Sequence, residues 1–295
     1  MNWRSVFSRI ALLFCAGVLV QACVADGDSV DSDSGADGMI FAPGVHRLDR
    51  IESSRDGFYI KGAGSGITVL EVPGGIFLNG KEPRLDGFTL VGSNNRNTGI
   101  TLKNSARARL SDIEIQGYEL GLLSLCEFGH RCWLHTYRDL YVYEGPGGSQ
   151  RTYNPRIRGI ELRYEGEKKS SGGWKEGGGF SNTHSIYGGR IAVPGVPLLI
   201  DGPSATALFG TYIDISVAAP RMTARTPGLQ LFGAHLDRSR KARNEDIPAL
   251  ILENPKFNRV KFFGQHINLL HHKLIVDGAG KPVERKHLFI SPEHY

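Results

Sequence analysis

The sequence predicts an all-β solenoid built from stacked parallel strands, and three observations lead to this fold class. The nine-residue phrase RLDGFTLVG at 84–92 recurs as RLSDIEIQG at 109–117. A second phrase, led by glycine, runs in step with the first, and glycine accounts for 38 of the 295 residues. No segment beyond the N-terminal signal shows the 3.6-residue periodicity of an amphipathic helix. Short strands joined by tight turns are therefore expected to dominate.

The first element is an export signal at 1–22. Arg4 and Arg9 precede an apolar run at 10–20, and small residues follow it. This run is too short to cross a bilayer core, which takes about 20 apolar residues. We therefore expect a signal peptide and not a membrane-spanning helix.

The end of the signal carries a candidate modification site. The segment VQAC at 20–23 resembles the lipobox of bacterial lipoproteins, which implies lipidation of Cys23 and attachment to a membrane. Val24 occupies the position where aspartate signals inner-membrane retention in enterobacterial lipoproteins, so the resemblance favours the outer membrane, facing the periplasm or the cell surface. The alternative is an ordinary secretory signal cleaved after Ala22.

Two further segments complete the expected domain organisation. Residues 23–40 form the anchor cysteine and a linker of Asp, Ser and Gly, which is expected to be flexible because it has almost nothing to bury. Residues 41–295 are long enough for one large domain. Without the two signal arginines and five linker aspartates, the 35 basic and 30 acidic residues become 33 and 25. This positive excess favours an acidic polysaccharide or other cell-envelope glycan as partner, and not nucleic acid.

The repeated phrase predicts the strands of one sheet. In both copies, and in TYRDLYVYEG at 136–145, apolar and polar residues alternate. The apolar positions are Phe88 and Leu90, Ile113 and Ile115, and Leu140 and Val142. Alternation of this kind buries one face of a strand and leaves the other in water.

The glycine-led phrase predicts a second set of strands. Its copies GIFL, GITL, GLLSL, GIEL, GVPLL and GLQL begin at residues 75, 99, 121, 159, 195 and 228. Two interleaved strands every 22 to 38 residues are typical of a solenoid, because each coil buries its apolar face against the next one. The competing fold is an antiparallel β-sandwich, in which Asn79-Gly80 and Asp86-Gly87 would form hairpin turns.

Two longer segments resemble a known superfamily. Residues 57–72, GFYIKGAGSGITVLEV, resemble the opening coils of pectate-lyase-like right-handed parallel β-helices. Residues 181–214 are similar to coils of phage tailspike and depolymerase proteins of the same superfamily. The resemblance covers roughly 42–267 and implies a right-handed parallel β-helix, a fold that carries lyases, hydrolases, epimerases and inert adhesins. The polygalacturonase motifs and the acidic calcium cluster of pectate lyases are absent from the sequence, which argues against pectin chemistry.

The outward positions of the strands supply candidate site residues. If the coils stack in sequence order, they form one polar and aromatic stripe: Thr89, Glu114, Tyr141, Tyr187, Asp214 and Lys261. Carbohydrate-active β-helices bind substrate on such stripes, which makes Tyr141, Tyr187 and Asp214 candidate substrate-binding residues. Trp174, in the glycine-rich stretch 172–180, is a fourth candidate, and ordinary packing is the alternative for its ring.

Two kinds of catalysis fit the candidate residues. A glycoside hydrolase needs two carboxyl groups about 5 to 9.5 Å apart, which Glu114 with Asp139, or Asp112 with Asp139, would supply. The alternative for both aspartates is the capping of a turn. A lyase needs a cation and a base, for which Arg138 and either His184 or His135 are the candidates. The alternative for each histidine is packing inside the protein.

The remaining cysteines predict a disulfide. Cys126 and Cys132 flank a short loop, and an exported protein meets an oxidising environment. His130 lies between them, but further ligands at matching spacing are missing, so neither a metal nor another cofactor is expected.

The combined prediction is an exported β-helix that acts on, or only binds, an acidic polysaccharide. The alternative is a noncatalytic glycan-binding, scaffold or adhesin-type lipoprotein. Convergence of Glu114, Arg138, Asp139 and His184 in one concave site would favour an enzyme. A homotrimer of the tailspike kind is a further expectation, and it requires apolar residues exposed along one edge of the solenoid.

Overall fold

The computed structural model places most of the predicted solenoid domain. It describes residues 30–31, 37–93, 96–144, 154, 156–165, 181–202, 205–223, 226, 228–239, 242–243, 245–256, 258–264 and 274–290. Cys23 and Trp174 lie outside the described residues, and so does the expected signal at 1–22. Within the described part, no helix is long and apolar enough to cross a bilayer.

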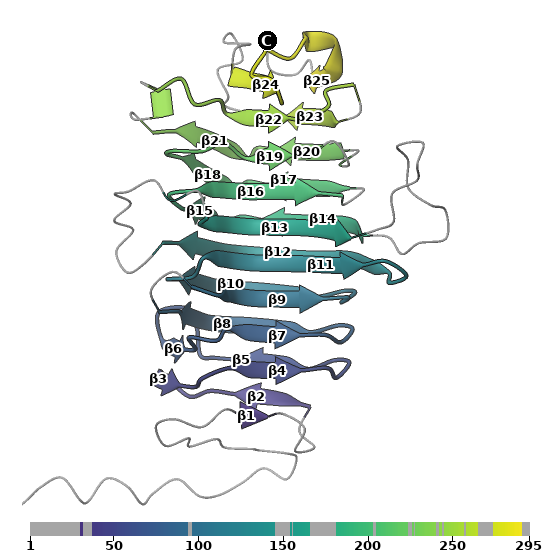
Figure 1. Cartoon of the computed structure of the whole chain (residues 1–295). Coiled ribbons are helices and arrows are strands. Elements are labelled where there is room, and N and C mark those ends of the chain that lie inside the picture. Colours follow the sequence, from purple (N-terminus) through teal and green to yellow (C-terminus); the bar gives the residue numbers. More distant parts are fainter. Residues whose placement is uncertain are drawn as a thin grey trace, which may run out of the picture.

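The strands stack into one column, as Figure 1 shows. They form a ten-stranded sheet and a fifteen-stranded sheet, and the chain passes from one sheet to the other in every coil. All pairs of named strands among the described residues are parallel. The all-β parallel β-helix is therefore confirmed, and the antiparallel sandwich is wrong.

The ten-stranded sheet contains the first five copies of the glycine-led phrase. Its strands are β1 (Val30–Asp31), β4 (Ile51–Ser53), β7 (Ile76–Leu78), β9 (Thr98–Lys103), β11 (Leu120–Glu127), β13 (Arg158–Glu165), β16 (Val196–Asp201), β19 (Arg221–Met222), β22 (Leu250–Leu252) and β24 (Ile275–Asp277). The sixth copy, at Gly228, belongs instead to the other sheet, because the two-residue strand β19 takes its place in this one.

The fifteen-stranded sheet contains the repeated phrase. Its strands are β2 (Gly38–Ile40), β3 (Gly44–Arg47), β5 (Tyr59–Lys61), β6 (Thr68–Glu71), β8 (Arg84–Val91), β10 (Arg109–Gln116), β12 (Cys132–Tyr143), β14 (Ser181–Tyr187), β15 (Arg190–Ala192), β17 (Thr206–Phe209), β18 (Tyr212–Ile215), β20 (Gly228–Phe232), β21 (His235–Arg238), β23 (Arg259–Phe263) and β25 (Leu288–Ile290). A 3-10 turn, η3 (Arg285–His287), precedes β25. The two copies of the phrase are β8 and β10, and they pair in register.

The alternating apolar residues form the core, as predicted. Phe88, Ile113 and Leu140 lie opposite one another on β8, β10 and β12, and each is at most 1 % exposed. Burying such a side chain stabilises the fold by about 1.5–3 kcal/mol. Because each coil covers the apolar face of the next, this contribution depends on stacking and not on any single coil.

Seven successive coils of the fifteen-stranded sheet, from β8 to β23, bend at one position. The bend is made by residues with positive φ: Gly87 (71°), Asp112 (49°), Asp139 (50°), Gly188 (62°), Gly210 (60°), Gly233 (56°) and Gly264 (62°). Glycine adopts this conformation without steric cost, and aspartate tolerates it better than most residues. The bend divides the sheet into a first half before it and a second half after it.

Asp112 and Asp139 stack at the bend, because their neighbours pair in register on β10 and β12. The Asp112 carboxylate accepts hydrogen bonds from the Ser65 backbone N–H at 3.0 Å and from the Ser65 hydroxyl at 2.5 Å. These contacts tie one coil to another across the bend. Asp112 therefore stabilises the turn, which is the alternative expected for this aspartate.

The predicted disulfide is present between Cys126 and Cys132, whose Cα atoms are 5.9 Å apart. The continuous apolar edge expected for a homotrimer is not found in the described part of the chain. Its exposed large apolar side chains fall at separate places: Ile40, Val45 and Ile67; Phe128, Trp133 and Leu134; and Phe289.

Candidate functional site

The four predicted catalytic residues do not converge. Glu114 lies in the second half of the fifteen-stranded sheet, whereas Arg138 is an exposed residue of the first half. Asp139 lies at the bend between the halves, and His184 is 0 % exposed inside the column. The strand alternation puts His184 on the inner face, next to His135, so it cannot meet a ligand on the outer face. The expected single concave site is therefore not formed by these residues.

The two histidines form part of a polar cluster inside the column. The rings of His135 and His184 stack with centroids 4.7 Å apart, and the Tyr137 hydroxyl lies 3.2 Å from His184 Nδ1. Burial lowers the pKa of His135 to about 4, and burial together with His135 also lowers the pKa of His184. Both rings are therefore neutral near pH 7. Both histidines are therefore packed inside the protein, which is the alternative to a catalytic role.

The predicted outward stripe is divided among separate rows of outward side chains that run from coil to coil, and each such row is called a side-chain column and named by one of its residues. Thr89, Glu114 and Tyr141 do lie in one column, on β8, β10 and β12. Asp214 lies two residues further along its strand, in the next outward column of the second half. Tyr187 belongs to the first half of the sheet.

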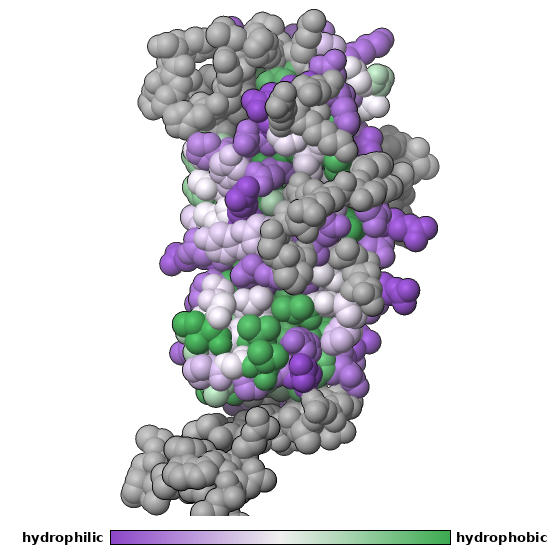
Figure 2. All heavy atoms as spheres, turned by 90° about the vertical axis from the view of Figure 1, so that its left-hand side faces the viewer, coloured by the Kyte–Doolittle hydropathy of each residue, from purple (hydrophilic) through white to green (hydrophobic). Residues whose placement is uncertain are grey.

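Two outward columns of the second half combine polar and aromatic side chains. The Tyr141 column and the Asp214 column run side by side over β10, β12, β15, β18 and β21. We call them the tyrosine–carboxylate face, which comprises Glu114, Gln116, Tyr141, Tyr143, Arg190, Tyr212, Asp214, His235 and Asp237. Figure 2 views this side of the molecule, where hydrophilic and intermediate residues lie above a hydrophobic patch.

Charged and hydroxyl groups of this face are linked across coils. Arg190 donates to Asp214 Oδ2 from Nε at 2.9 Å and from Nη2 at 2.5 Å. The Tyr212 hydroxyl donates to Asp237 Oδ2 at 2.7 Å. The guanidinium of Arg190 lies over the Tyr212 ring, 5.4 Å from its centroid, and the His235 ring stacks on that ring at 5.6 Å. Half of the Arg190 side chain and 18 % of the Asp214 side chain remain exposed.

The pKa values of three side chains on this face are shifted from their ordinary values. Burial raises the pKa of the Asp214 carboxyl, although Arg190 opposes this, and the nearby Asp237 raises it further. The hydrogen bond to Asp237 and burial raise the pKa of Tyr212, and burial raises the pKa of Tyr143. Asp214 is therefore easier to protonate than an ordinary aspartate, and neither tyrosine is prepared to act as a base.

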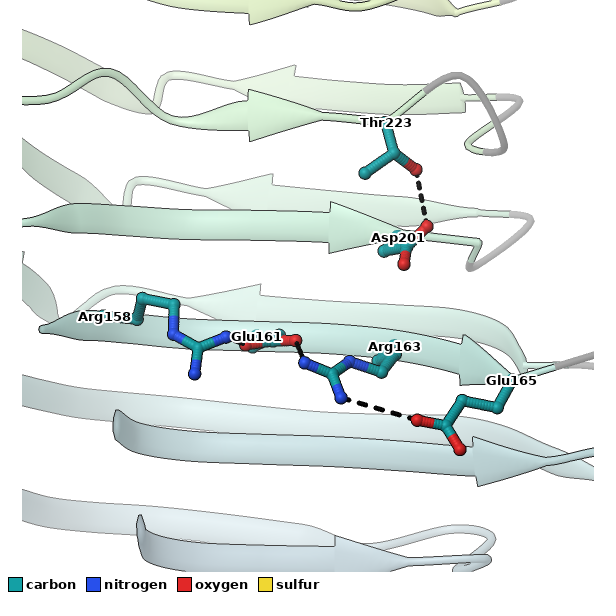
Figure 3. Close-up of polar contacts among 6 residues, drawn as sticks. All are labelled: Arg158, Glu161, Arg163, Glu165, Asp201 and Thr223. Carbon is teal, nitrogen blue, oxygen red and sulfur yellow. Dashed lines mark hydrogen bonds and ion pairs between the residues drawn. The ribbon is translucent and has the colours of Figure 1, made fainter. Parts of the chain in front are cut away.

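A second polar network lies on the outward side of the ten-stranded sheet. Figure 3 shows Arg158 and Arg163 on either side of Glu161 along β13. The Glu161 side chain is 0 % exposed, and Glu165 lies 3.4 Å from Arg163. A carboxylate that is closed off from solvent by its arginine partners cannot reach a ligand. This network therefore stabilises β13 and is not a candidate site.

Aromatic rings also stack along the first half of the fifteen-stranded sheet. Tyr187, Phe209, Phe232 and Phe263 follow one another with centroids 4.5 to 4.7 Å apart and nearly parallel planes. Phe209 thus covers one face of Tyr187. On the neighbouring coil at its other side Tyr187 pairs in register with the exposed Arg138, and its sugar-binding role stays a prediction.

Sequence reasoning missed six residues of the tyrosine–carboxylate face: Gln116, Tyr143, Arg190, Tyr212, His235 and Asp237. Their signal is a repeated pair of polar or aromatic residues two positions apart. The pairs are Glu114 and Gln116, Tyr141 and Tyr143, Tyr212 and Asp214, and His235 and Asp237. The second pair follows the first after 27 residues and the fourth follows the third after 23, which is coil spacing. The coil between Tyr141 and Tyr212 has Arg190 and Ala192 at these positions and so interrupts the pattern.

Comparison with known proteins adds one structural similarity. No protein-family model matches the chain, and no curated protein matches it. The A-module of mannuronan C-5 epimerase AlgE6 from Azotobacter vinelandii is similar to 78 % of this chain over 78 % of its own, with 14 % identity and a TM-score of 0.30. A TM-score this low supports no inference about function, which therefore rests on the geometry of the tyrosine–carboxylate face.

Proposed function

We propose that this protein binds an acidic polysaccharide along the tyrosine–carboxylate face. The observation that carries the proposal is the in-register arrangement of aromatic, hydroxyl and charged side chains over consecutive coils. Coils follow one another every ~4.8 Å, so the face repeats like the chain of a polymer. Aromatic rings offer flat apolar surfaces to sugar rings, while carboxylates and guanidinium groups bind hydroxyl and carboxylate groups.

The charge of the partner follows from Arg190. Its guanidinium is half exposed and presents donors in a fixed fork, the geometry that suits a carboxylate. The chain as a whole carries a formal charge of +5, which attracts polyanions. Glu114, Asp214 and Asp237 oppose this attraction locally, so a uronic acid must bind where Arg190 compensates its charge.

Cell-envelope placement belongs to the same proposal. The lipobox-like segment and the polar linker support export with a lipid on Cys23, which would hold the domain beside envelope glycans. Labelling of growing cells with an alkyne fatty acid tests this part. Label on the wild-type protein but not on Cys23→Ala is expected, and equal labelling of both would contradict it.

Binding is tested by titrating the protein, in a calorimeter, with uronic-acid oligosaccharides of several linkages. Tyr141→Ala and Tyr212→Ala should each weaken binding by about 2- to 12-fold, which corresponds to the 0.5–1.5 kcal/mol of an aromatic contact. Arg221→Gln, on the ten-stranded sheet where Arg221 pairs with Glu253 at 3.1 Å, is the matched control and should bind normally. If no acidic oligosaccharide binds, the alternative of a scaffold protein is favoured.

A further inference from the structure

We propose that the tyrosine–carboxylate face also hydrolyses the polysaccharide it binds, with Asp214 as general acid and Asp237 as nucleophile. We infer further that the acidic sugar activates Asp214 by drawing Arg190 away from it. This inference rests on the proposed function, because it requires an acidic sugar on that face.

The spacing of the two carboxylates supports hydrolysis. Asp214 on β18 and Asp237 on β21 are partners in register on adjacent coils. Their Cα atoms are therefore separated by about one coil, ~4.8 Å. Carboxyl groups about 5–5.5 Å apart are typical of retaining glycosidases, in which one carboxylate attacks the sugar directly. Side chains carried on Cα atoms this close can place their carboxyl groups at that distance.

The two carboxylates have different surroundings, as the two roles require. Asp214 is mostly covered, with 18 % of its side chain exposed, and burial favours its neutral form. Asp237 is exposed and accepts a hydrogen bond from the Tyr212 hydroxyl. A half-buried acid beside an exposed carboxylate is an arrangement that can separate proton donor from nucleophile.

Arg190 is the group that controls Asp214. In the free protein both contacts of Arg190 go to a single Asp214 oxygen, Oδ2, and this pairing keeps the carboxyl ionised. A sugar carboxylate offers two oxygens to the same guanidinium and is able to pair with it side by side. Once Arg190 turns to the ligand, Asp214 loses its cation and retains its burial, so it takes up a proton.

The remaining groups around Asp214 do not replace that cation. On β15 its direct neighbour is Ala192, and on β21 it is Asp237. The titratable or charged groups on the adjacent strands and on β18 itself are Arg190 on β15, Tyr212 on β18, and His235 and Asp237 on β21; Tyr141 and Tyr143 on β12 and Glu114 on β10 lie further along the same face. Arg190 is the one permanent cation among them.

The proposed hydrolysis balances with water alone and needs no oxidant or reductant. The Asp214 carboxyl gives its proton to the glycosidic oxygen while an Asp237 oxygen attacks the anomeric carbon, so the bond to the leaving sugar breaks and a glycosyl ester forms. Asp214, now a carboxylate, removes a proton from water, and the water oxygen displaces Asp237 from the anomeric carbon. One water is consumed, and both aspartates return to their starting states.

Elimination, the competing reaction of uronic-acid polymers, fits the site less well. It needs a base that removes the sugar C5 proton. The raised pKa values of Tyr143 and Tyr212 keep both phenols protonated, so neither tyrosine offers a phenolate to remove that proton. Hydrolysis gives new reducing ends alone, whereas elimination adds an unsaturated uronate that absorbs in the ultraviolet.

The experiment uses the full chain and any uronic-acid oligosaccharide that it binds. Reducing ends and unsaturated-uronate absorbance are measured for the wild type, Asp214→Asn, Asp237→Asn and the control Asp201→Asn, a matched change on the ten-stranded sheet. We expect reducing ends without absorbance, a loss of at least about 100-fold in both site variants, and normal activity in the control. Bound but uncut sugar, or an unsaturated product, overturns hydrolysis and leaves the proposed binding function standing. Absence of binding overturns the binding function itself.

A separate experiment tests the arginine exchange, in which Arg190 leaves Asp214 and pairs with the sugar carboxylate. Calorimetric titration of Asp237→Asn in two buffers of different ionisation enthalpy measures the protons taken up on binding. We expect an uptake approaching one proton for the acidic sugar at mildly acidic pH, and none for the same sugar after reduction of its carboxyl groups. The additional change Asp214→Asn should abolish the uptake while binding persists. Equal uptake with and without Asp214 would overturn the exchange.

Discussion

Replacing Arg163 with leucine should destabilise the protein far more than replacing its partner Glu161 with leucine. Glu161 is completely buried between Arg158 and Arg163, so the loss of one arginine leaves a buried carboxylate with incomplete compensation. Breaking a buried ion pair in this way costs about 3–5 kcal/mol, and the lower end applies because Arg158 remains. For a domain of this size, 3 kcal/mol lowers the melting temperature by roughly 6–12 °C.

Glu161→Leu should behave in the opposite way. It removes the buried charge and places an apolar side chain between Leu123 and Leu199, its neighbours in register. Arg158 and Arg163 keep 27 % and 33 % of their side chains exposed, so water continues to solvate them. The free energy of unfolding should stay within about 1 kcal/mol of the wild type.

Urea unfolding followed by circular dichroism measures both changes, and the double variant Glu161→Leu/Arg163→Leu completes the cycle. The double variant should recover most of the stability that Arg163→Leu loses. Arg221→Leu is the control, because its pair with Glu253 is partly exposed and should contribute less than about 1 kcal/mol. If Glu161→Leu proves as destabilising as Arg163→Leu, the cost of an uncompensated buried charge is not what determines stability here.

Three further predictions concern the column itself. The free energy of unfolding should fall as the pH drops from about 6.5 toward 4, because the folded state keeps His135 neutral with a pKa of about 4 while His135 in the unfolded chain takes up a proton. The loss is on the order of 3 kcal/mol at pH 4, and His135→Gln should make stability depend less on pH. Gly189→Ala should unfold the bend, since a Cβ atom there would lie 2.2 Å from the Leu140 carbonyl oxygen, whereas Gly129→Ala meets no atom within 4 Å and should cost only about 1 kcal/mol of backbone strain; equal melting temperatures would contradict this. The disulfide between Cys126 and Cys132 closes only a short loop, so its reduction should lower the free energy of unfolding by about 2 kcal/mol. The control is a Cys126→Ala/Cys132→Ala variant, whose stability should not respond to reductant.

The sequence pattern predicts the column well because the column depends on local alternation. Phe88, Ile113 and Leu140 recur at coil spacing, and the same burial is repeated in each coil. The stacking of Asp112 on Asp139 follows from the same spacing. These features need only one strand and its nearest copy, so the sequence contains all the information.

The site is harder to predict because it depends on which residues of each strand point outward after the bend. The pair Gly188 and Gly189 replaces Asp139 and Leu140 at the bend, and the chain then continues as the short strand β15. The alternation is thus interrupted between His184, which faces the core, and Arg190, which faces solvent. Strands of three or four residues carry too little alternation to reveal which side is outward. The contacts of Arg190 and Asp214 emerge only when neighbouring coils are placed in register.

A crystal structure of Asp237→Asn with a bound uronic-acid oligosaccharide tests the central claim most directly. The account predicts a sugar chain lying along β12, β15 and β18, with one sugar carboxylate paired to Arg190 and Asp214 no longer in contact with it. A chain bound on the ten-stranded sheet, or an Arg190 still paired with Asp214 beneath the sugar, would contradict it.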